Sequence, residues 1–309
     1  MGWLTGEDRS RYLAVAGGYL RGRPVEHTLM LTVLASLGAE AAGAHAHAGA
    51  QADAGPTPRY GWWRSGAGAV AGAFLQVPPY PVLLSSMPGG AAGELAGLLA
   101  GAGGGPTEVN AAVPVGEAFA QAWRRGTGTD ATVRARLRLY RLAVLQPPSS
   151  LPAGHPRVAG APDRDLLIRW YQAFGEEIGE PPHDGARQVD DRLGHGGFTL
   201  WQAGGETVCL AGVSRPAAAV VRVGPVYTPP GFRGRGYAAA LTATVSAAAR
   251  DAGADDVVLF TDLANPTSNA IYQRLGYRPV EDRVVLSFGG RPFEGGPDQN
   301  VAETSFTPS

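Results

Sequence analysis

The chain has 309 residues, of which 44% are hydrophobic and 17% charged, and its formal net charge is −1. The length predicts two domains, each large enough for its own core. The near-zero charge gives no general attraction for nucleic acid or anionic lipid, so we expect a small-molecule or protein partner instead. No apolar run has the length of a signal peptide or of a membrane span, about 18 residues, which favours a cytoplasmic protein that does not contact a membrane.

The residue types that are scarce exclude two kinds of chemistry. The single cysteine, Cys209, cannot form an internal disulfide, and its apolar neighbours Val208 and Leu210 predict a buried strand thiol. Every basic residue is arginine, which excludes lysine catalysis. His45 and His47 lie in an aperiodic Ala, Gly and His-rich segment, 39–58, that we interpret as a loop without a metal site.

The first half, 1–145, alternates helical and strand-like patterns. We expect helices at 7–16, 25–37, 91–102 and 117–125. Strands are expected at 60–64, 69–77, 81–86, 108–113 and 132–145, the first three separated by the Gly and Pro turns typical of a meander.

The segment 146–156 contains four prolines in eleven residues and is the predicted interdomain linker. In the second domain, 157–288, we expect helices at 163–178, 236–252 and 266–275, and strands at 198–202, 207–213, 218–228, 256–261 and 278–288. The two halves share an element order, which indicates an internal duplication of one fold. Residues 289–309 have turn formers and little apolar periodicity, so we expect a flexible tail.

The first chemical motif is a glycine loop that joins a strand to a helix. It contains Arg233, Gly234, Arg235, Gly236, Tyr237 and Ala238. Glycines permit close backbone approach, and the first amides of a helix lack partners, so these N–H groups can converge on a pyrophosphate. The two arginines can add charge-assisted hydrogen bonds. Two alternatives remain, a plain glycine turn and a dinucleotide loop of the form G-x-G-x-x-A, although the latter normally follows the first strand of a βαβ unit rather than a meander.

The second motif is a short helix with well-marked ends. Asn265 is placed as its N-cap, Pro266 occupies the first helical position and Gly276 follows the last turn. Spacings of three and four residues put Asn265, Ser268 and Tyr272 along one polar face. Taken singly, each of the three also fits a structural role as cap, first-turn hydroxyl or half-buried ring.

Together, RGRGYA at 233–238 and NPTSNAIYQRLGY at 265–277 resemble the GNAT superfamily of N-acetyltransferases, over about residues 160–288. Arg233, Gly236 and Ala238 meet that family's Arg/Gln-x-x-Gly-x-Gly/Ala coenzyme A loop. The resemblance implies an α/β (α+β) fold of two tandem GNAT-like domains, each a mixed, mostly antiparallel sheet flanked by helices. The first-half junction LLSSMPGGAAGELA lacks the arginine, so this copy is expected to be degenerate and not to bind coenzyme A.

The resemblance also implies the roles of the site residues. The strand end Val226, Tyr227 and Thr228 is expected beside the pantetheine arm, and the amides of 234–238 on the pyrophosphate. Asn265 and Ser268 are expected to contact the pantetheine, and Tyr272 to lie near the thioester sulfur.

The resulting functional prediction is an acyl-CoA-dependent N-acyltransferase that uses acetyl-CoA and needs no metal. Its acceptor is expected to be a small-molecule, peptide or protein amine that attacks directly. Because a free tyrosine has a pKa of about 10 and a thiol of about 8.5, Tyr272 is expected to hydrogen-bond the sulfur rather than to give up its proton. The sequence does not choose a general base among five acids, Glu176, Glu177, Asp190, Asp191 and Asp262. A non-catalytic acyl-CoA sensor and a dinucleotide-binding oxidoreductase are the alternatives.

Overall fold

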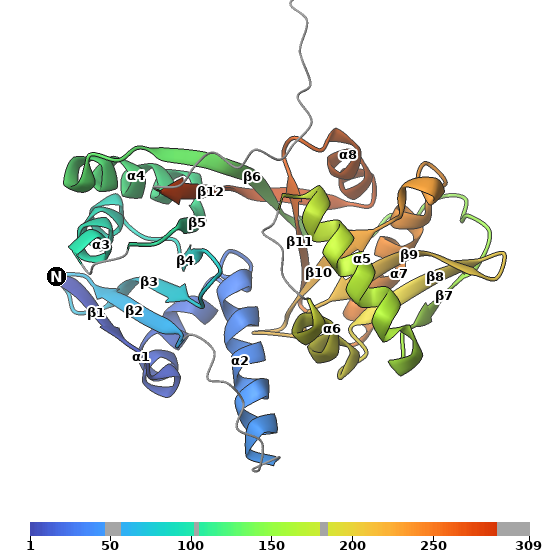
Figure 1. Cartoon of the computed structure of the whole chain (residues 1–309), viewed down its shortest axis with the longest axis horizontal. Coiled ribbons are helices and arrows are strands. Elements are labelled where there is room, and N and C mark those ends of the chain that lie inside the picture. The colour runs from blue at the N-terminus through green and yellow to red at the C-terminus, as the bar shows by residue number, and fades with distance from the viewer. Residues whose placement is uncertain (47–56, 102–104, 180–184, 289–309) are drawn as a thin grey trace, which may run out of the picture.

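The computed structural model describes residues 1–46, 57–101, 105–179 and 185–288. Its helices lie against a 12-stranded sheet with the order β1-β2-β3-β4-β5-β12-β6-β11-β10-β9-β8-β7 (Figure 1). The first half supplies β1 (Gly2–Gly6), α1 (Arg9–Arg21), α2 (Thr28–Ala46), β2 (Arg59–Arg64), β3 (Val70–Gln76), β4 (Val82–Leu84), α3 (Gly89–Gly101), β5 (Glu108–Ala112), α4 (Val113–Thr127) and β6 (Ala131–Leu142).

The second half repeats this order. It supplies β7 (His155–Val158), α5 (Arg164–Glu177), α6 (Ala186–Leu193), β8 (Phe198–Ala203), β9 (Glu206–Val213), β10 (Val220–Tyr227), α7 (Tyr237–Asp251), β11 (Asp256–Asp262), α8 (Pro266–Arg274) and β12 (Tyr277–Phe288). β4 and β5 run parallel, as do β10 and β11, and the other neighbouring strands run antiparallel. Read from either end, the sheet therefore presents the same succession of pairings, which agrees with the predicted duplication.

The last strand of each half lies against the other half. β12 pairs with β5, β6 pairs with β11, and the two strands pair with each other from Tyr277↔Leu142 to Phe288↔Ala131. Arg138 of β6 holds Asp282 of β12 through two hydrogen bonds of 2.7 and 2.9 Å. The sheet thus continues through both halves, and each half is completed by a strand of the other.

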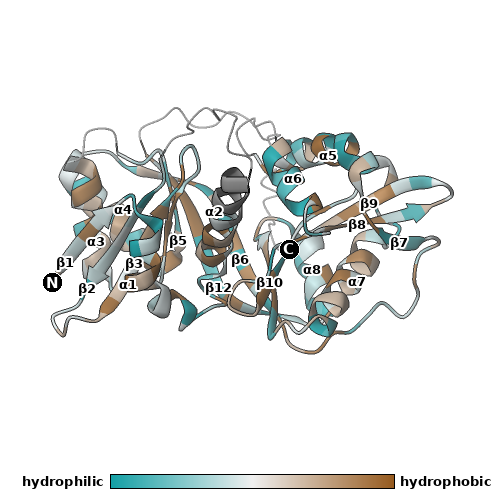
Figure 2. Ribbon diagram, turned by 90° about the horizontal axis from the view of Figure 1, so that it is seen from below, coloured by the Kyte–Doolittle hydropathy of each residue, from teal (hydrophilic) through white to brown (hydrophobic). Residues whose placement is uncertain are grey.

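Two apolar layers cover the sheet of the second half. Leu241 and Val245 of α7 pack with Val257 and Leu259 of β11 on one face. Leu167 of α5 and Val189 of α6 pack with Phe198, Leu200, Leu210 and Tyr227 on the other. Figure 2 shows α5 and α6 on one side of these strands and α7 and α8 on the opposite side. Burial of both faces explains the nearly continuous apolar runs of β9 and β10.

The prediction of a loop at 39–58 was wrong at its start, because α2 continues to Ala46. The alanine-rich run from Ala39 has high helix propensity, which outweighed its lack of periodicity. His47 and the rest of the segment up to 56 lie outside the described residues, as does the expected tail.

Three short elements were not predicted: β1, β7 and α6. β7 begins inside the expected linker and contains Pro156. It lies at the edge of the sheet, where a strand tolerates proline because one side needs no ladder hydrogen bond. α6 has only eight residues, four of them charged, and one buried side chain, Val189, so it offers too few apolar positions to mark a helix in the sequence.

Candidate functional site

The site begins where β10 leaves β11. Their parallel ladder covers Val220↔Asp256 to Val223↔Leu259 in the described chain. Gly224 then takes a φ of +148°, and the register against β9 shifts between Val223 and Val226. Val226 and Tyr227 remain paired with β9, so the end of β10 keeps one neighbour while its other side faces away from any ladder partner. This opening has main-chain groups available for a ligand.

The glycine loop borders this opening. Gly234 and Gly236 have φ values of +75° and +83°, which L side chains rarely adopt, and a Cβ at either position would meet nothing within 4 Å. α7 begins at Tyr237 without a side-chain cap. Among the described residues no hydrogen bond reaches the amides of 234–239. These donors, at the positive end of a 15-residue helix, suit a diphosphate.

Both arginines of the loop donate hydrogen bonds to main-chain carbonyls just before it. Arg233 donates from Nε to the Thr228 carbonyl at 2.8 Å and pairs with Glu177 at 2.5 Å. Arg235 donates to the Gly231 carbonyl at 3.1 Å. The Arg233 and Glu177 side chains are 47% and 43% exposed, so exchanging this ion pair for a phosphate contact costs little.

The structure confirms the predicted ends of α8. The Asn265 side chain accepts a hydrogen bond from the Ser268 amide at 3.0 Å, Pro266 opens the helix, and Gly276 has a φ of +96° just beyond it. Asn265 is exposed and Ser268 is half-buried. The cap occupies one acceptor of Asn265 and leaves its amide N–H groups for a ligand.

One support of α8 was missed from the sequence. Tyr140 of β6, fully buried, donates to Asn269 Oδ1 at 2.8 Å and accepts from Gln273 Nε2 at 3.0 Å. Asn269 in turn donates to the carbonyls of Asp262 and Asn265. A strand of the first half therefore fixes the polar helix of the second. The spacing of Asn269 and Gln273, one helical turn apart, was the available signal.

Tyr272 is half-buried and its ring meets Tyr277 edge-on at 6.1 Å. Burial raises its pKa above the ordinary value, and the neighbouring Tyr277 and Cys209 act in the same direction. The hydroxyl makes no hydrogen bond with any described residue, so it is available as a donor. Tyr237, the first residue of α7, instead has its ring buried in the core between α7 and the sheet, where the ring centroids of Tyr237 and Trp201 are 6.5 Å apart. It can therefore offer a ligand only its backbone.

Cys209 is buried in β9, as expected, and accepts a hydrogen bond from Thr228 Oγ1 at 3.2 Å. Burial raises the pKa of the thiol to about 12. It is therefore a neutral wall residue close to the end of β10, not a nucleophile.

Most of the five candidate bases already have partners. Glu177 pairs with Arg233, Asp190 with Arg164 and Asp191 with Arg215. Asp262 accepts a hydrogen bond from the Ala264 amide at 2.8 Å, directly after β11. Glu176 is exposed. Asp262 is the last residue of β11 and lies beyond the end of the ladder with β10 at Leu259, so it is at the edge of the strand opening. In the described ranges no three His, Cys, Asp or Glu side chains form a group that could hold a metal ion.

The sequence also missed two arginines on the α5–α6 side of the sheet. Arg192 of α6 and Arg222 of β10 each have a buried Nε without a hydrogen-bond partner. Nothing in the motif pattern marked them, because Arg222 interrupts an otherwise apolar strand and α6 was not predicted.

Known proteins share this architecture. Residues 164–277, which contain both motifs, match the family model of the acetyltransferase (GNAT) family. The chain carries a GNAT-family acetyltransferase domain. No curated protein matches the sequence.

Solved structures extend the likeness beyond that domain. A Drosophila protein superposes with a TM-score of 0.64 at 14% identity, over 92% of this chain and 98% of its own. A GCN5-related N-acetyltransferase from Sphaerobacter thermophilus gives 0.54 at 18% identity, over 74% and 79%. An acetyltransferase of the GNAT family from Colwellia psychrerythraea gives 0.51 at 14%, over 74% and 85%. With the repeated strand order, they show a fold of two GNAT-like halves.

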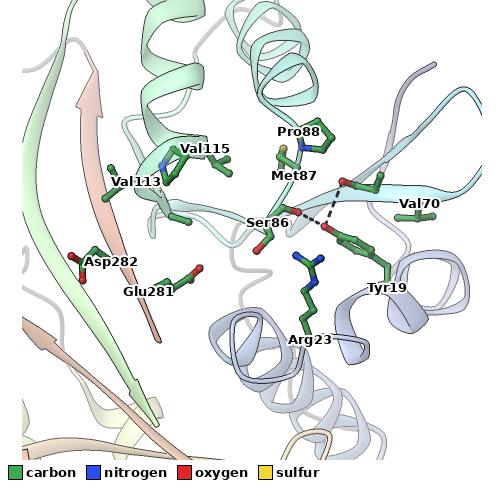
Figure 3. A pocket seen from close by; sticks show the side chains of 13 residues that line it. Tyr19, Arg23, Val70, Ser86, Met87, Pro88, Val113, Val115, Glu281 and Asp282 are labelled. Atoms are coloured by element: carbon green, nitrogen blue, oxygen red, sulfur yellow. Dashed lines mark hydrogen bonds between the residues drawn. The ribbon is translucent and has the colours of Figure 1, made fainter. Parts of the chain in front are cut away.

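The first half has a cavity of about 720 Å³ at the matching place, between the β4–α3 connection and the β5–α4 junction (Figure 3). Its lining includes Tyr19, Arg23, Met87 and Val113. Next to it Arg283 of β12, 4% exposed, pairs with the lining residue Glu281 at 2.7 Å and donates to Leu84 O and Asn110 Oδ1. The guanidinium thus occupies main-chain acceptors at the end of β4, on the strand that corresponds to β10.

None of the helices in the described ranges is long and apolar enough to cross a membrane.

Proposed function

We propose that the second half transfers an acyl group, most simply acetyl, from acyl-CoA to a primary amine by direct attack. The observation that carries this proposal is the opening between β10 and β11 next to a loop of unbonded amides. The GNAT family of residues 164–277 supports acyl transfer over the oxidoreductase alternative.

In this proposal the amides of 234–238 bind the diphosphate, with Arg233 released from Glu177 toward it. Val226, Tyr227 and Thr228 offer backbone groups to the pantetheine amides, and Asn265 and Ser268 contact the arm from α8. A backbone donor at the end of β10 polarises the thioester carbonyl, which stabilises the negative charge that develops on its oxygen.

The amine nitrogen forms the new bond to the carbonyl carbon, and the carbon–sulfur bond breaks with its electron pair left on sulfur. Tyr272 donates a hydrogen bond to that sulfur. Its raised pKa keeps the hydroxyl protonated, which suits a donor and disfavours complete proton transfer. The amine loses its proton to water or to Asp262 at the edge of the opening.

Two measurements test this function. Calorimetric titration with acetyl-CoA, and with NAD for comparison, measures ligand choice, and thiol release over an amine panel measures turnover. Binding of acetyl-CoA with amine-dependent thiol release is the expected result. Binding without turnover on any amine would favour a sensor, and no binding at millimolar acetyl-CoA would reject the proposal.

A further inference from the structure

Arg222 lies on β10 immediately before the bulge at Gly224, on the face of the sheet opposite α7. Val220, two residues earlier and so on the same face, packs with Val25 of the first half. The Arg222 guanidinium donates to Thr32 Oγ1 of α2 at 3.1 Å, and its Nε is buried without a partner. Burial lowers the pKa of Arg222 to about 10, with the charge of Arg192 adding to the effect.

Arg192 approaches the same place from α6. Its guanidinium lies 5.6 Å from the ring centroid of Tyr171 and 5.7 Å from that of Phe198, and it donates to the carbonyl of Gly224 at 3.4 Å. Its Nε is also buried and unpartnered. Arg192 is thus held directly at the bulge where the acyl carbonyl is expected.

Neither arginine forms an ion pair within the described residues. The nearest acids in the sequence of α6 are used elsewhere, Asp190 by Arg164 and Asp191 by Arg215. Both side chains are half-buried, each with a buried Nε, and two neighbouring like charges without a counterion are costly because charges that lose contact with water are normally paired in proteins. An anion bound between the partly exposed guanidinium groups of Arg192 and Arg222 would offset this repulsion.

We propose that Arg192 and Arg222 bind a carboxylate of the acceptor, so that the substrate is an amino acid rather than a simple amine. This inference rests on the proposed acyl transfer. The face is the one opposite the α7 loop, so the acceptor approaches the bulge from the α5–α6 side while the diphosphate stays on the α7 side. Guanidinium groups match the planar, two-oxygen geometry of a carboxylate.

The position also limits the length of the acceptor. Because Arg192 contacts the bulge carbonyl at 3.4 Å, a carboxylate on Arg192 lies close to the reacting carbon. We therefore expect the amine and the carboxylate of the acceptor to lie close together. An α- or β-amino acid fits this spacing, whereas a long diamine or a protein lysine does not.

The test compares acceptors that differ only in the carboxylate. Glycine, L-alanine and L-phenylalanine are assayed against methylamine, ethylamine and phenethylamine, with acetyl-CoA fixed and thiol release followed. We expect kcat/KM at least tenfold higher for the acid of each pair. Equal values, or a preference for the amines, would overturn the carboxylate site while leaving acyl transfer in place. Loss of acetyl-CoA binding would instead reject the proposed function itself.

Variants locate the effect. Arg222→Gln and Arg192→Gln should raise KM for the preferred amino acid at least tenfold and lower kcat/KM for that amino acid at least tenfold more than kcat/KM for its amine. Arg187→Gln, on the exposed side of α6, is the matched control and should change neither. An unchanged KM in both variants would overturn the assignment.

A readout that needs no turnover completes the test. With coenzyme A present, the preferred amino acid should raise the Tm of the wild type but not that of Arg222→Gln. Equal shifts would count against the site.

Discussion

Replacing Arg283 with alanine tests whether the exchanged strand β12 holds the first half together. The Arg283 side chain is 4% exposed and its partner Glu281 is 17% exposed. The guanidinium donates to Glu281 at 2.7 Å, Asn110 Oδ1 at 2.9 Å and Leu84 O at 3.0 Å. Removing one partner of a buried pair leaves the other charge uncompensated, which costs about 3–5 kcal/mol.

This magnitude should be visible in both chemical and thermal unfolding. With an unfolding entropy of about 2.1 cal/mol/K per residue over roughly 270 described residues, a loss of about 3–5 kcal/mol lowers Tm by roughly 5–9 °C. Urea unfolding followed by far-ultraviolet circular dichroism gives the free energy, and scanning calorimetry gives Tm.

Arg278→Ala, on the same strand, is the control. Arg278 is exposed and, among the described residues, bonds only to the nearby carbonyls of Gln273 and Tyr277, so its loss should change the free energy of unfolding by no more than about 0.5 kcal/mol. If Arg283→Ala and Arg278→Ala have equal stabilities, the guanidinium does not anchor β12 to β4 and β5, and the reasoning fails.

Four further outcomes are expected. Gly236→Ala forces a Cβ into a left-handed conformation and toward the diphosphate, so acyl-CoA affinity should fall at least tenfold, whereas Gly253→Ala, with a φ of +92° at the far end of α7, should leave affinity unchanged in the same titration. Tyr140→Phe removes two hydrogen bonds from α8; we expect about 1–2 kcal/mol less stability and a lower kcat, and an unchanged kcat would show that the helix needs no such support. Tyr272→Phe should lower kcat more than it lowers acyl-CoA affinity. Burial raises the pKa of Tyr272 above 10, so at any pH below 10 the wild-type rate should show no decrease caused by loss of this proton. A decrease in that pH range that Tyr272→Phe abolishes would refute the assignment. Calorimetry should find one acyl-CoA per chain, since Arg283 occupies acceptors of the first-half opening, and two sites would contradict this.

Local signals in the sequence predicted the local structure well. Asn265, Pro266 and Gly276 marked α8 because a cap, a first-turn proline and a left-handed glycine act within a few residues of themselves. Gly234 and Gly236 marked the loop for the same reason, and both do have the positive φ that only glycine adopts readily.

The missing parts depend on contacts between residues far apart in the chain. The sequence pattern of β6 does not say which strands β6 pairs with. The alternation of Val133, Ala135, Leu137 and Leu139 predicts a strand, but it would be the same whether that strand pairs with its own half or with the other. The role of Arg222 could not be predicted, because it depends on groups of α2, α5 and α6 that come close to Arg222 only in the folded protein. Tyr140 likewise gave no signal in the sequence, although its hydroxyl donates a hydrogen bond to Asn269 of α8 in the second half.

The reciprocal placement of β6 and β12 makes the two copies interdependent. A truncation after residue 145 would remove β12 and leave β5 without its neighbour on one side. A fragment that begins at 157 would lose β6 and leave β11 unpaired on one side. Each fragment would therefore expose the unpaired backbone groups of a strand edge, which promotes aggregation. A duplicated sequence joined in this way can lose the catalytic activity of one copy. It cannot lose the last strand of that copy, however, because the sheet of the other copy is completed by that strand.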